Sequence, residues 1–229
     1  QIWSQDNIQG VADLSGPNGS SLVGYLPAGT GAVATTVQAK LRESVSVKDF
    51  GALGNGVAND AAAFTLAIAA LPAFGELIVP AGGTYLLGSQ ITVDKALNIK
   101  LLGTIKPFVN AGAAATPLFN ITASNVSING EGTGKIDGIS LTYSNWCGIG
   151  AAGAAGFIDN VSVSGLIFTN LGLDSTSAYA VSFASVKYGR ILSNVLYNVG
   201  VVSNVSGGGF GIYTQWCDQL LVEGNQGEL

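Results

Sequence analysis

The stretch "VSVKDFGALGNGVANDAAAFTLAIAAL" (Val45–Leu71) changes character along its length. Apolar residues alternate over 45–50, which predicts a short strand. The glycines of "GALGNGV" (51–57) then predict a loop, because glycine adopts backbone angles with positive φ at little cost. An alanine-rich helix is predicted over about 59–71. One helix therefore stands before a long segment that reads mainly as strands and turns.

The predicted helix has clear ends and one apolar face. Asn59 or Asp60 is a suitable N-cap, since a short polar side chain can accept a hydrogen bond from the first turn. Pro72 ends the helix, because proline has no backbone N–H to continue the hydrogen-bond ladder. Three apolar residues at helical spacing form the stripe that we expect to be buried: Phe64, Ile68 and Leu71.

The composition favours a strand-rich protein with few charges. Hydrophobic residues make up 48% of the 229 residues, charged residues make up only 10%, and glycine occurs 33 times. The net charge is −5 and the lysines and arginines are scattered singly, which argues against a nucleic-acid partner. No apolar run reaches the ~18 residues of a membrane span, so we expect no membrane insertion.

Two residue types are absent from the sequence. Without histidine, the chain has no Ser-His-Asp triad and no histidine base, and most zinc sites are excluded. Cys147 and Cys217 fit no metal-binding or redox spacing and are interpreted as buried thiols, so neither a metal nor another cofactor is expected. Because there is no methionine and the chain starts at Gln1, we interpret it as a fragment with a boundary or processing site there.

Residues 1–44 are interpreted as a neck or linker, and residues 45–229 as a second domain. "GPNG" (16–19) and "PAGTG" (27–31) are turn signals, and the apolar pieces around them do not amount to a core. A short helix is predicted in "TTVQAKLRES" (35–44). A segment of this kind packs on the next domain or on a copy of itself.

Five segments after residue 90 can be superimposed without gaps. Each is a short strand that ends at Gly or Asn, residues suited to a tight corner. Successive ends lie 27 to 35 residues apart, which indicates a repeat architecture. The segments are "LNIKLLG" (97–103), "SNVSING" (124–130), "DNVSVSG" (159–165), "YGRILSN" (188–194) and "DQLLVEG" (218–224).

A repeat of one to three strands with corner turns predicts an all-β fold, the right-handed parallel β-helix. In this solenoid each coil buries its inward residues against the coils on either side. The first coil would leave core residues and unpaired backbone groups exposed. We expect the predicted helix to cover this end as a cap, with Phe64, Ile68 and Leu71 facing the first coil.

"VKDFGALGNGVANDAAAFTLAI" (47–68) resembles the opening motif of pectate-lyase-like β-helix proteins, a family that includes bacteriophage tailspikes. Asn55 and Asn59 replace the aspartates that are usual there, and both keep a turn-forming or capping side chain. "ELIVPAGGTYLLG" (76–88) resembles the family's first coil. The preceding segment, residues 19–52, is similar to the neck of phage tailspikes, which favours a tailspike over a secreted pectinase.

The resemblance implies a homotrimer in the virion, attached to the phage tail, its baseplate or another tailspike component. It would assemble in the host cytoplasm and act on a bacterial surface polysaccharide, either capsule or lipopolysaccharide. The preferred interpretation is the particle-proximal part of a tailspike, truncated at its C-terminal end, which links the virion to a polysaccharide-binding or polysaccharide-degrading β-helix. Two alternatives stay open: a glycan depolymerase active within this piece, either hydrolase or lyase, and a non-catalytic glycan-binding module.

Candidate catalytic residues come from the carboxylates of the repeats. Glycoside hydrolysis needs two carboxyl groups about 5–9.5 Å apart. Asp159 and Asp218 share the first position of the aligned segments, about two coils apart, whereas Glu131 and Glu223 are out of register with each other. Asp159 and Asp218 are also explicable as ordinary corner residues, because aspartate is a natural turn residue. Asp137 in "KIDG" is interpreted as a turn aspartate.

Aromatic and basic residues after residue 140 supply the candidate glycan-binding set, because aromatic rings offer flat faces to sugars. Three adjacent members, Lys187, Tyr188 and Arg190, also form the best group for β-elimination from a uronic acid. For the two tryptophans, packing in the core is the preferred interpretation. The set is Trp146, Tyr179, Lys187, Tyr188, Arg190, Tyr213 and Trp216.

Overall fold

The computed structural model describes residues 12–107, 117–138, 146–153, 156–171, 178–199 and 210–228. The chain divides into two compact units, Gln1–Val45 and Ser46–Leu229, each described here by itself. No helix in these described ranges is long and apolar enough to span a membrane.

The first unit has little interior of its own. It contains α2 (Gly19–Leu22), β1 (Gly24–Tyr25), β2 (Thr35–Thr36) and α3 (Val37–Leu41), and β1 pairs antiparallel with β2. The Thr36 hydroxyl caps α3 by accepting a hydrogen bond from the Ala39 N–H. Among the described residues of this unit, only Gly19 is buried.

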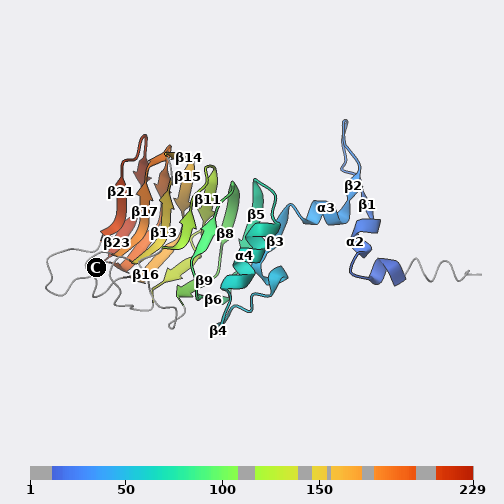
Figure 1. Ribbon diagram of the computed structural model, residues 1–229, viewed down its shortest axis with the longest axis horizontal. Coiled ribbons are helices and arrows are strands. Elements are labelled where there is room, and N and C mark those ends of the chain that lie inside the picture. Colours follow the sequence, from blue (N-terminus) through green and yellow to red (C-terminus); the bar gives the residue numbers. More distant parts are fainter. Residues whose placement is uncertain are drawn as a thin grey trace, which may run out of the picture. The chain divides into compact units, whose positions relative to one another are not determined.

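The second unit is a stack of β-coils built from three long sheets (Figure 1). The first sheet contains β3 (Ser44–Ser46), β5 (Gly75–Val79), β8 (Leu97–Leu101), β11 (Val126–Asn129), β15 (Val161–Ser164), β19 (Arg190–Leu192) and β22 (Leu221–Glu223). The second sheet contains β4 (Asn55–Asn59), β6 (Thr84–Leu87), β9 (Thr104–Pro107), β12 (Lys135–Asp137), β16 (Ile167–Leu171), β20 (Val195–Val199) and β23 (Gln226–Glu228). The third sheet contains β7 (Ile91–Val93), β10 (Pro117–Ile121), β13 (Trp146–Ala152), β17 (Ala178–Ala184) and β21 (Phe210–Gln215).

Successive strands along the chain belong to different sheets, and each pairs with the equivalent strand of the next coil. From β4 onwards, neighbouring strands in the described part of the unit pair in parallel. A further short sheet at one corner joins β14 (Ile158–Asp159) to β18 (Val186–Lys187). The predicted parallel β-helix is therefore confirmed.

Columns of apolar side chains fill the interior of the coils. In the first sheet, residues that pair across successive strands form one such column, and each is at most 1% exposed. Stacking of this kind gives every inward residue an apolar neighbour on both sides, which stabilises the solenoid coil by coil. The column consists of Leu77, Ile99, Ile128, Val163 and Ile191.

The gap-free alignment of the five repeats is right for one step and wrong for three. β11 and β15 pair as aligned. Val126 lies opposite Leu97 instead of Ile99, and Val163 lies opposite Ile191 instead of the residue after it. The last step, between β19 and β22, is also shifted by one residue. A one-residue shift exchanges the inner and outer faces of a strand, so burial of the apolar column fixes the register of the last two steps. The first step differs by two residues, which keeps the same face inward.

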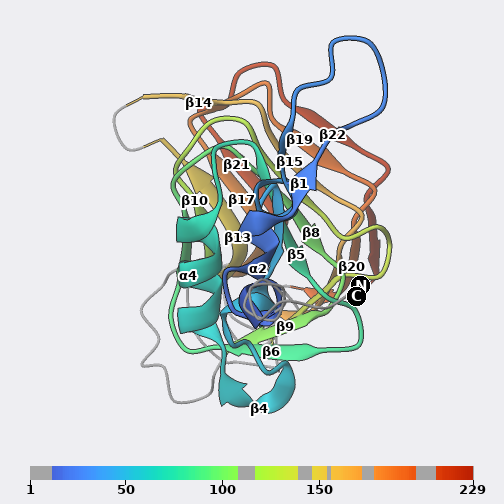
Figure 2. The same cartoon turned by 90° about the vertical axis from the view of Figure 1, so that its right-hand side faces the viewer.

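Helix α4 (Ala61–Ala70) packs beside β7, next to the third sheet in the end-on view of Figure 2. Phe64, Ile68 and Leu71 are 0–3% exposed, which places the predicted apolar stripe in the interior. At the C-terminal end of the helix, the Lys95 ammonium donates hydrogen bonds to the carbonyl oxygens of Ala69 (3.2 Å) and Leu71 (3.1 Å). A cation at a helix C-terminus also interacts favourably with the helix dipole.

The approach to α4 differs from the sequence prediction. Residues 47–50 form a 3-10 helix, η1 (Val47–Phe50), instead of continuing a strand, because Ser46 and Asp49 make a reciprocal capping box. The predicted loop over 51–57 contains the start of β4. The Asp60 carboxylate organises this segment: it is 3% exposed and accepts hydrogen bonds from the N–H groups of Leu53 (2.7 Å) and Gly54 (3.2 Å).

Candidate glycan-binding groove

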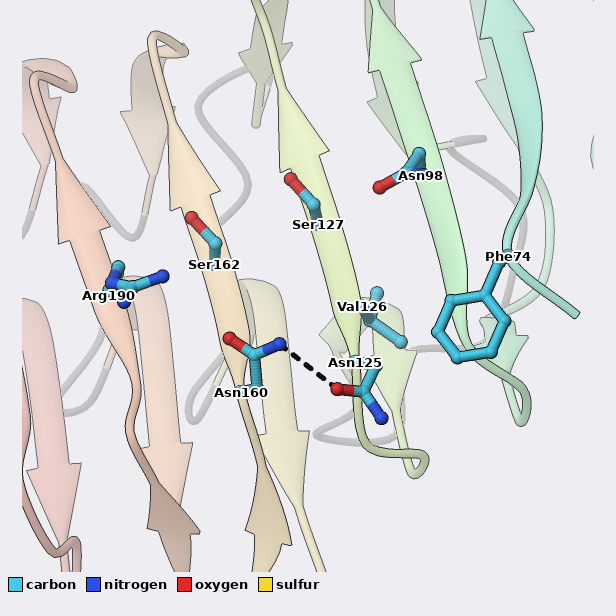
Figure 3. A pocket seen from close by; sticks show the side chains of 8 residues that line it. All are labelled: Phe74, Asn98, Asn125, Val126, Ser127, Asn160, Ser162 and Arg190. Atoms are coloured by element: carbon cyan, nitrogen blue, oxygen red, sulfur yellow. Dashed lines mark hydrogen bonds between the residues drawn. The ribbon is translucent and has the colours of Figure 1, made fainter.

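The outer face of the first sheet carries a groove of about 330 Å³ (Figure 3). Its floor is a row of outward-facing side chains at equivalent positions on four successive strands. These side chains alternate along each strand with the buried apolar column, so they point to the outer face of the sheet, where polar residues are exposed to solvent. In order of pairing, the row is Asn98, Ser127, Ser162 and Arg190.

One wall of the groove comes from the corner at which the chain enters the first sheet. Phe74, Asn125 and Asn160 have positive φ angles of 64°, 60° and 57°. Asparagine often adopts this conformation, and Asn160 Nδ2 donates a hydrogen bond to Asn125 Oδ1 at 3.0 Å (Figure 3). Phe74 is unusual there, because positive φ strains a bulky residue and its side chain is 67% exposed. Packing within the chain does not explain this exposed ring.

Arg190 supplies the only charge among the residues that line the groove. No carboxylate lies within ion-pair distance of its guanidinium in the described ranges. The remaining polar groups are amides and hydroxyls, which can both donate hydrogen bonds to sugar hydroxyls and accept them. An aromatic wall, a neutral polar floor and the Arg190 cation make a surface suited to binding a carbohydrate.

Asp159 and Asp218 lie in one column with Lys187 between them. Asp159 pairs with Lys187 in the β14–β18 sheet, and an isolated bridge pairs Lys187 with Asp218. The two aspartates are thus two strand spacings apart, about 9.6 Å. Lys187 Nζ is 3.7 Å from Asp218 Oδ2 and 5.1 Å from the centre of the Tyr188 ring. The pKa of Lys187 is raised chiefly by Tyr188 and to a smaller extent by Asp218 and Asp159. The lysine therefore stays protonated between the carboxylates.

Glu131 and Glu223 are not brought together. Glu131 follows the corner after β11 and forms an ion pair of 3.0 Å with Lys100, which raises the pKa of that lysine. Glu223 is the last residue of β22 and pairs with Leu192 of β19. Asp137 is not a turn residue: it ends β12, is 7% exposed and lies 3.4 Å from Lys106 Nζ.

The aromatic candidates lie on several surfaces. Trp216 is 72% exposed, so its interpretation as a core residue is wrong; it occupies a corner with φ of 51° after the last strand of the third sheet. Tyr188 is 45% exposed at the corner before β19. Tyr179 and Tyr213 contact each other on β17 and β21, with ring centroids 4.9 Å apart. Trp146 begins β13, and its side chain lies outside what the structure describes.

Of the sequence-derived candidates whose side chains the structure describes, only Arg190 lines the groove. The amides and Phe74 were missed, because neutral side chains give no catalytic signal. A correct register would have revealed them, since the polar row appears only when β8, β11, β15 and β19 are aligned as the structure pairs them. In the described ranges, no group of three or more His, Cys, Asp or Glu residues is placed to hold a metal ion.

Sequence similarity connects the chain to β-helix enzymes and to phage tailspikes. Residues 44–149 match the family described as "Rhamnogalacturonase A/epimerase, pectate lyase-like". The tail spike protein of an Escherichia phage is 37% identical over 113 residues, which cover 49% of this chain and 12% of the relative. The tail spike protein of Shigella phage Sf6 is 33% identical over 107 residues, which cover 44% of this chain and 16% of the relative. The chain therefore spans a small part of these relatives.

Solved structures share the fold at low sequence identity. The tailspike protein of E. coli bacteriophage HK620, in complex with a pentasaccharide, has a TM-score of 0.72 and 21% identity, covering 96% of this chain and 41% of that one. A mutant of the same tailspike in complex with a hexasaccharide has a TM-score of 0.74 at the same identity and coverage. These likenesses support the parallel β-helix architecture.

Proposed function

We propose that this parallel β-helix, which is similar to phage tailspikes in sequence and fold, is the part of a tailspike that links the virion to a bacterial surface polysaccharide. The groove on the first sheet binds this polysaccharide. One observation carries the proposal: Phe74, with its exposed ring, and Arg190, with no acidic partner in the described ranges, flank a row of three neutral polar side chains on successive coils.

The relatives support the same class of ligand. The curated relatives are tail spike proteins, and the similar HK620 tailspike structures contain a pentasaccharide or a hexasaccharide. In this chain the polar row would accept hydroxyl groups, Phe74 would contact the C–H face of a sugar ring, and Arg190 would bind a carboxylate or several hydroxyls. The polysaccharide is either capsule or lipopolysaccharide.

We further propose a homotrimer that is attached to the phage tail or another tailspike component, assembles in the host cytoplasm and acts at the bacterial surface. Support for self-association comes from the first unit, where large apolar side chains remain exposed. Burying such surface against other copies is favourable at roughly 25 cal/mol per Å². The exposed apolar residues of this unit include Leu22, Val23, Leu26, Val33 and Leu41.

A depolymerase active within this piece is the second candidate, favoured by the shared column of Asp159 and Asp218. Their backbones are about 9.6 Å apart, close to the largest separation of the two carboxyl groups in an inverting glycosidase, which places a water molecule between them. Here Lys187 fills the interval and pairs with Asp218. Binding is therefore the better-supported role.

A polysaccharide panel separates these roles. Purified capsular and O-antigen polysaccharides from Escherichia and Shigella strains would be titrated into the protein by calorimetry, and the mixtures would be assayed for new reducing ends and for unsaturated uronates. Binding of one polysaccharide without cleavage supports the proposal. Cleavage that is lost in Asp159→Asn or Asp218→Asn would replace it with the depolymerase, and failure to bind any polysaccharide would contradict both.

A further inference from the structure

Two exposed aromatic side chains lie outside the groove, at the corner occupied by the β14–β18 sheet. Phe157 immediately precedes β14 and is 55% exposed. Trp216 immediately follows β21 and is 72% exposed. Neither residue packs in the interior, although full burial of a large aromatic side chain contributes several kcal/mol. Their exposure calls for an explanation outside the core.

The strand register places these two residues at equivalent positions on coils two apart. Ile158 pairs with Val186, so Phe157 stands at the level of Ser185, whose carbonyl accepts a hydrogen bond from the Ile158 N–H at 3.0 Å. The Ser185 N–H donates to the Gln215 carbonyl at 3.0 Å, and Trp216 is therefore at the level of Ser185 on the next coil. The two aromatic positions are two strand spacings apart, about 9.6 Å. The position between them is occupied by the small residue Ser185.

A row of charged side chains runs parallel to this column, two residues further along each coil. Asp159, Lys187 and Asp218 pair in that order and carry a net charge of −1. Lys187 and Asp218 are partly exposed, with 36% and 51% of their side-chain surfaces accessible. We call the two rows together the corner platform: Phe157, Ser185 and Trp216 with Asp159, Lys187 and Asp218.

We propose that the corner platform is a second polysaccharide-binding site, which takes a neutral segment about three sugars long. The first and third sugar rings stack their C–H faces on Phe157 and Trp216, and the hydroxyls of the segment donate hydrogen bonds to the carboxylates of Asp159 and Asp218. The negative balance of the charged row disfavours an acidic sugar here, in contrast to the cationic end of the groove. The inference rests on the proposed function, because the ligand is the same class of polysaccharide.

Tryptophan fluorescence gives a direct test. A neutral O-antigen polysaccharide that binds the chain would be titrated while emission is recorded, and we expect a shift that is absent in Trp216→Phe. Phe157→Ala and Trp216→Ala should each weaken binding about three- to tenfold, the effect of losing one stacking contact. Tyr197→Ala is the matched control, since Tyr197 is an exposed aromatic residue (43%) on the second sheet.

The outcomes distinguish this inference from the proposed function. Binding that is unaffected by Phe157→Ala and Trp216→Ala would overturn the corner platform and leave the groove intact. A change of oligomeric mass in these variants, with binding unchanged, would also overturn it, because the rings would then contact another copy of the chain. Failure of the unaltered chain to bind any polysaccharide would overturn both proposals.

Discussion

The ring of Phe64 meets the ring of Tyr85 edge to face, with centroids 5.8 Å apart and an interplanar angle of 75°. Phe64 belongs to the capping helix and Tyr85 to the second sheet, so this contact joins the cap to the first coils. Both side chains are fully buried. The cap is thus part of the core of the β-helix and not a separate cover.

Phe64→Ala should lower the free energy of unfolding by about 3–5 kcal/mol, because it removes a fully buried ring and leaves a cavity. The matched control is Leu66→Ala on the same helix, where the side chain is 56% exposed and the change should cost about 0.5 kcal/mol or less. Urea unfolding followed by circular dichroism measures both variants. Equal decreases in the free energy of unfolding for the two variants would show that the helix does not cap the core.

Asn194→Ala should be destabilising although no apolar contact is lost. Asn194 is fully buried, its Oδ1 accepts a hydrogen bond from the Leu166 N–H at 3.0 Å, and its Nδ2 donates to the Val163 carbonyl at 3.1 Å. Each buried group left unpaired costs about 1–3 kcal/mol. Asn98→Ala is the control, because Asn98 is an exposed asparagine on β8 and its backbone does not have a positive φ. An Asn194→Ala variant as stable as the control would contradict this role.

Lys187 should titrate above the ordinary lysine pKa of 10.5, chiefly because of Tyr188 and also because of Asp218. A raised pKa in the folded state means that the protonated lysine stabilises the fold fully below pH 10.5 and loses this effect as pH rises through the folded pKa. The lysine should therefore cause no change in stability between about pH 5 and 9. Heteronuclear NMR of the side chain measures the pKa, which Tyr188→Phe should lower. A value at or below 10.5 in the unaltered chain would refute the arrangement.

The sequence was enough to predict the features of the fold that depend on the pattern of apolar residues and on the residues that end helices and strands. Phe64, Ile68 and Leu71 stood out at helical spacing, and the repeat near 30 residues gave the parallel β-helix. The strand register was harder to predict, because corner segments differ in length from coil to coil. Each strand also offers only two or three apolar positions to align. Ser46 and Asp49 formed a capping box that the alternating pattern of 45–50 concealed.

Most of the candidate site could not be predicted from the sequence, again because the strand register was not known. Asn98, Ser127 and Ser162 carry no charge and are far apart along the chain, so their common row depends on the register. Trp216 could not be assigned to surface or core from its neighbours, because a corner residue with positive φ departs from strand alternation. Asp159 and Asp218 were aligned correctly, but the position of Lys187 between them needed the structure.

Sedimentation equilibrium should give the mass of three chains at micromolar concentration. Leu26→Asp should shift the distribution toward single chains, because Leu26 is 66% exposed and an apolar interface does not accommodate an unpaired carboxylate. Thr30→Asp, at an exposed position of the same unit, is the control and should leave the mass unchanged. A single-chain mass for the unaltered protein would contradict the homotrimer.

The most direct test of the groove compares Ser162→Tyr with Ser164→Tyr. Both residues lie on β15 and face outward, and only Ser162 lines the groove. The dissociation constant for a bound polysaccharide, measured by calorimetry, should rise about tenfold or more in Ser162→Tyr, where the new ring fills the groove, and stay unchanged in Ser164→Tyr. Equal affinity in the two variants would contradict glycan binding on the first sheet.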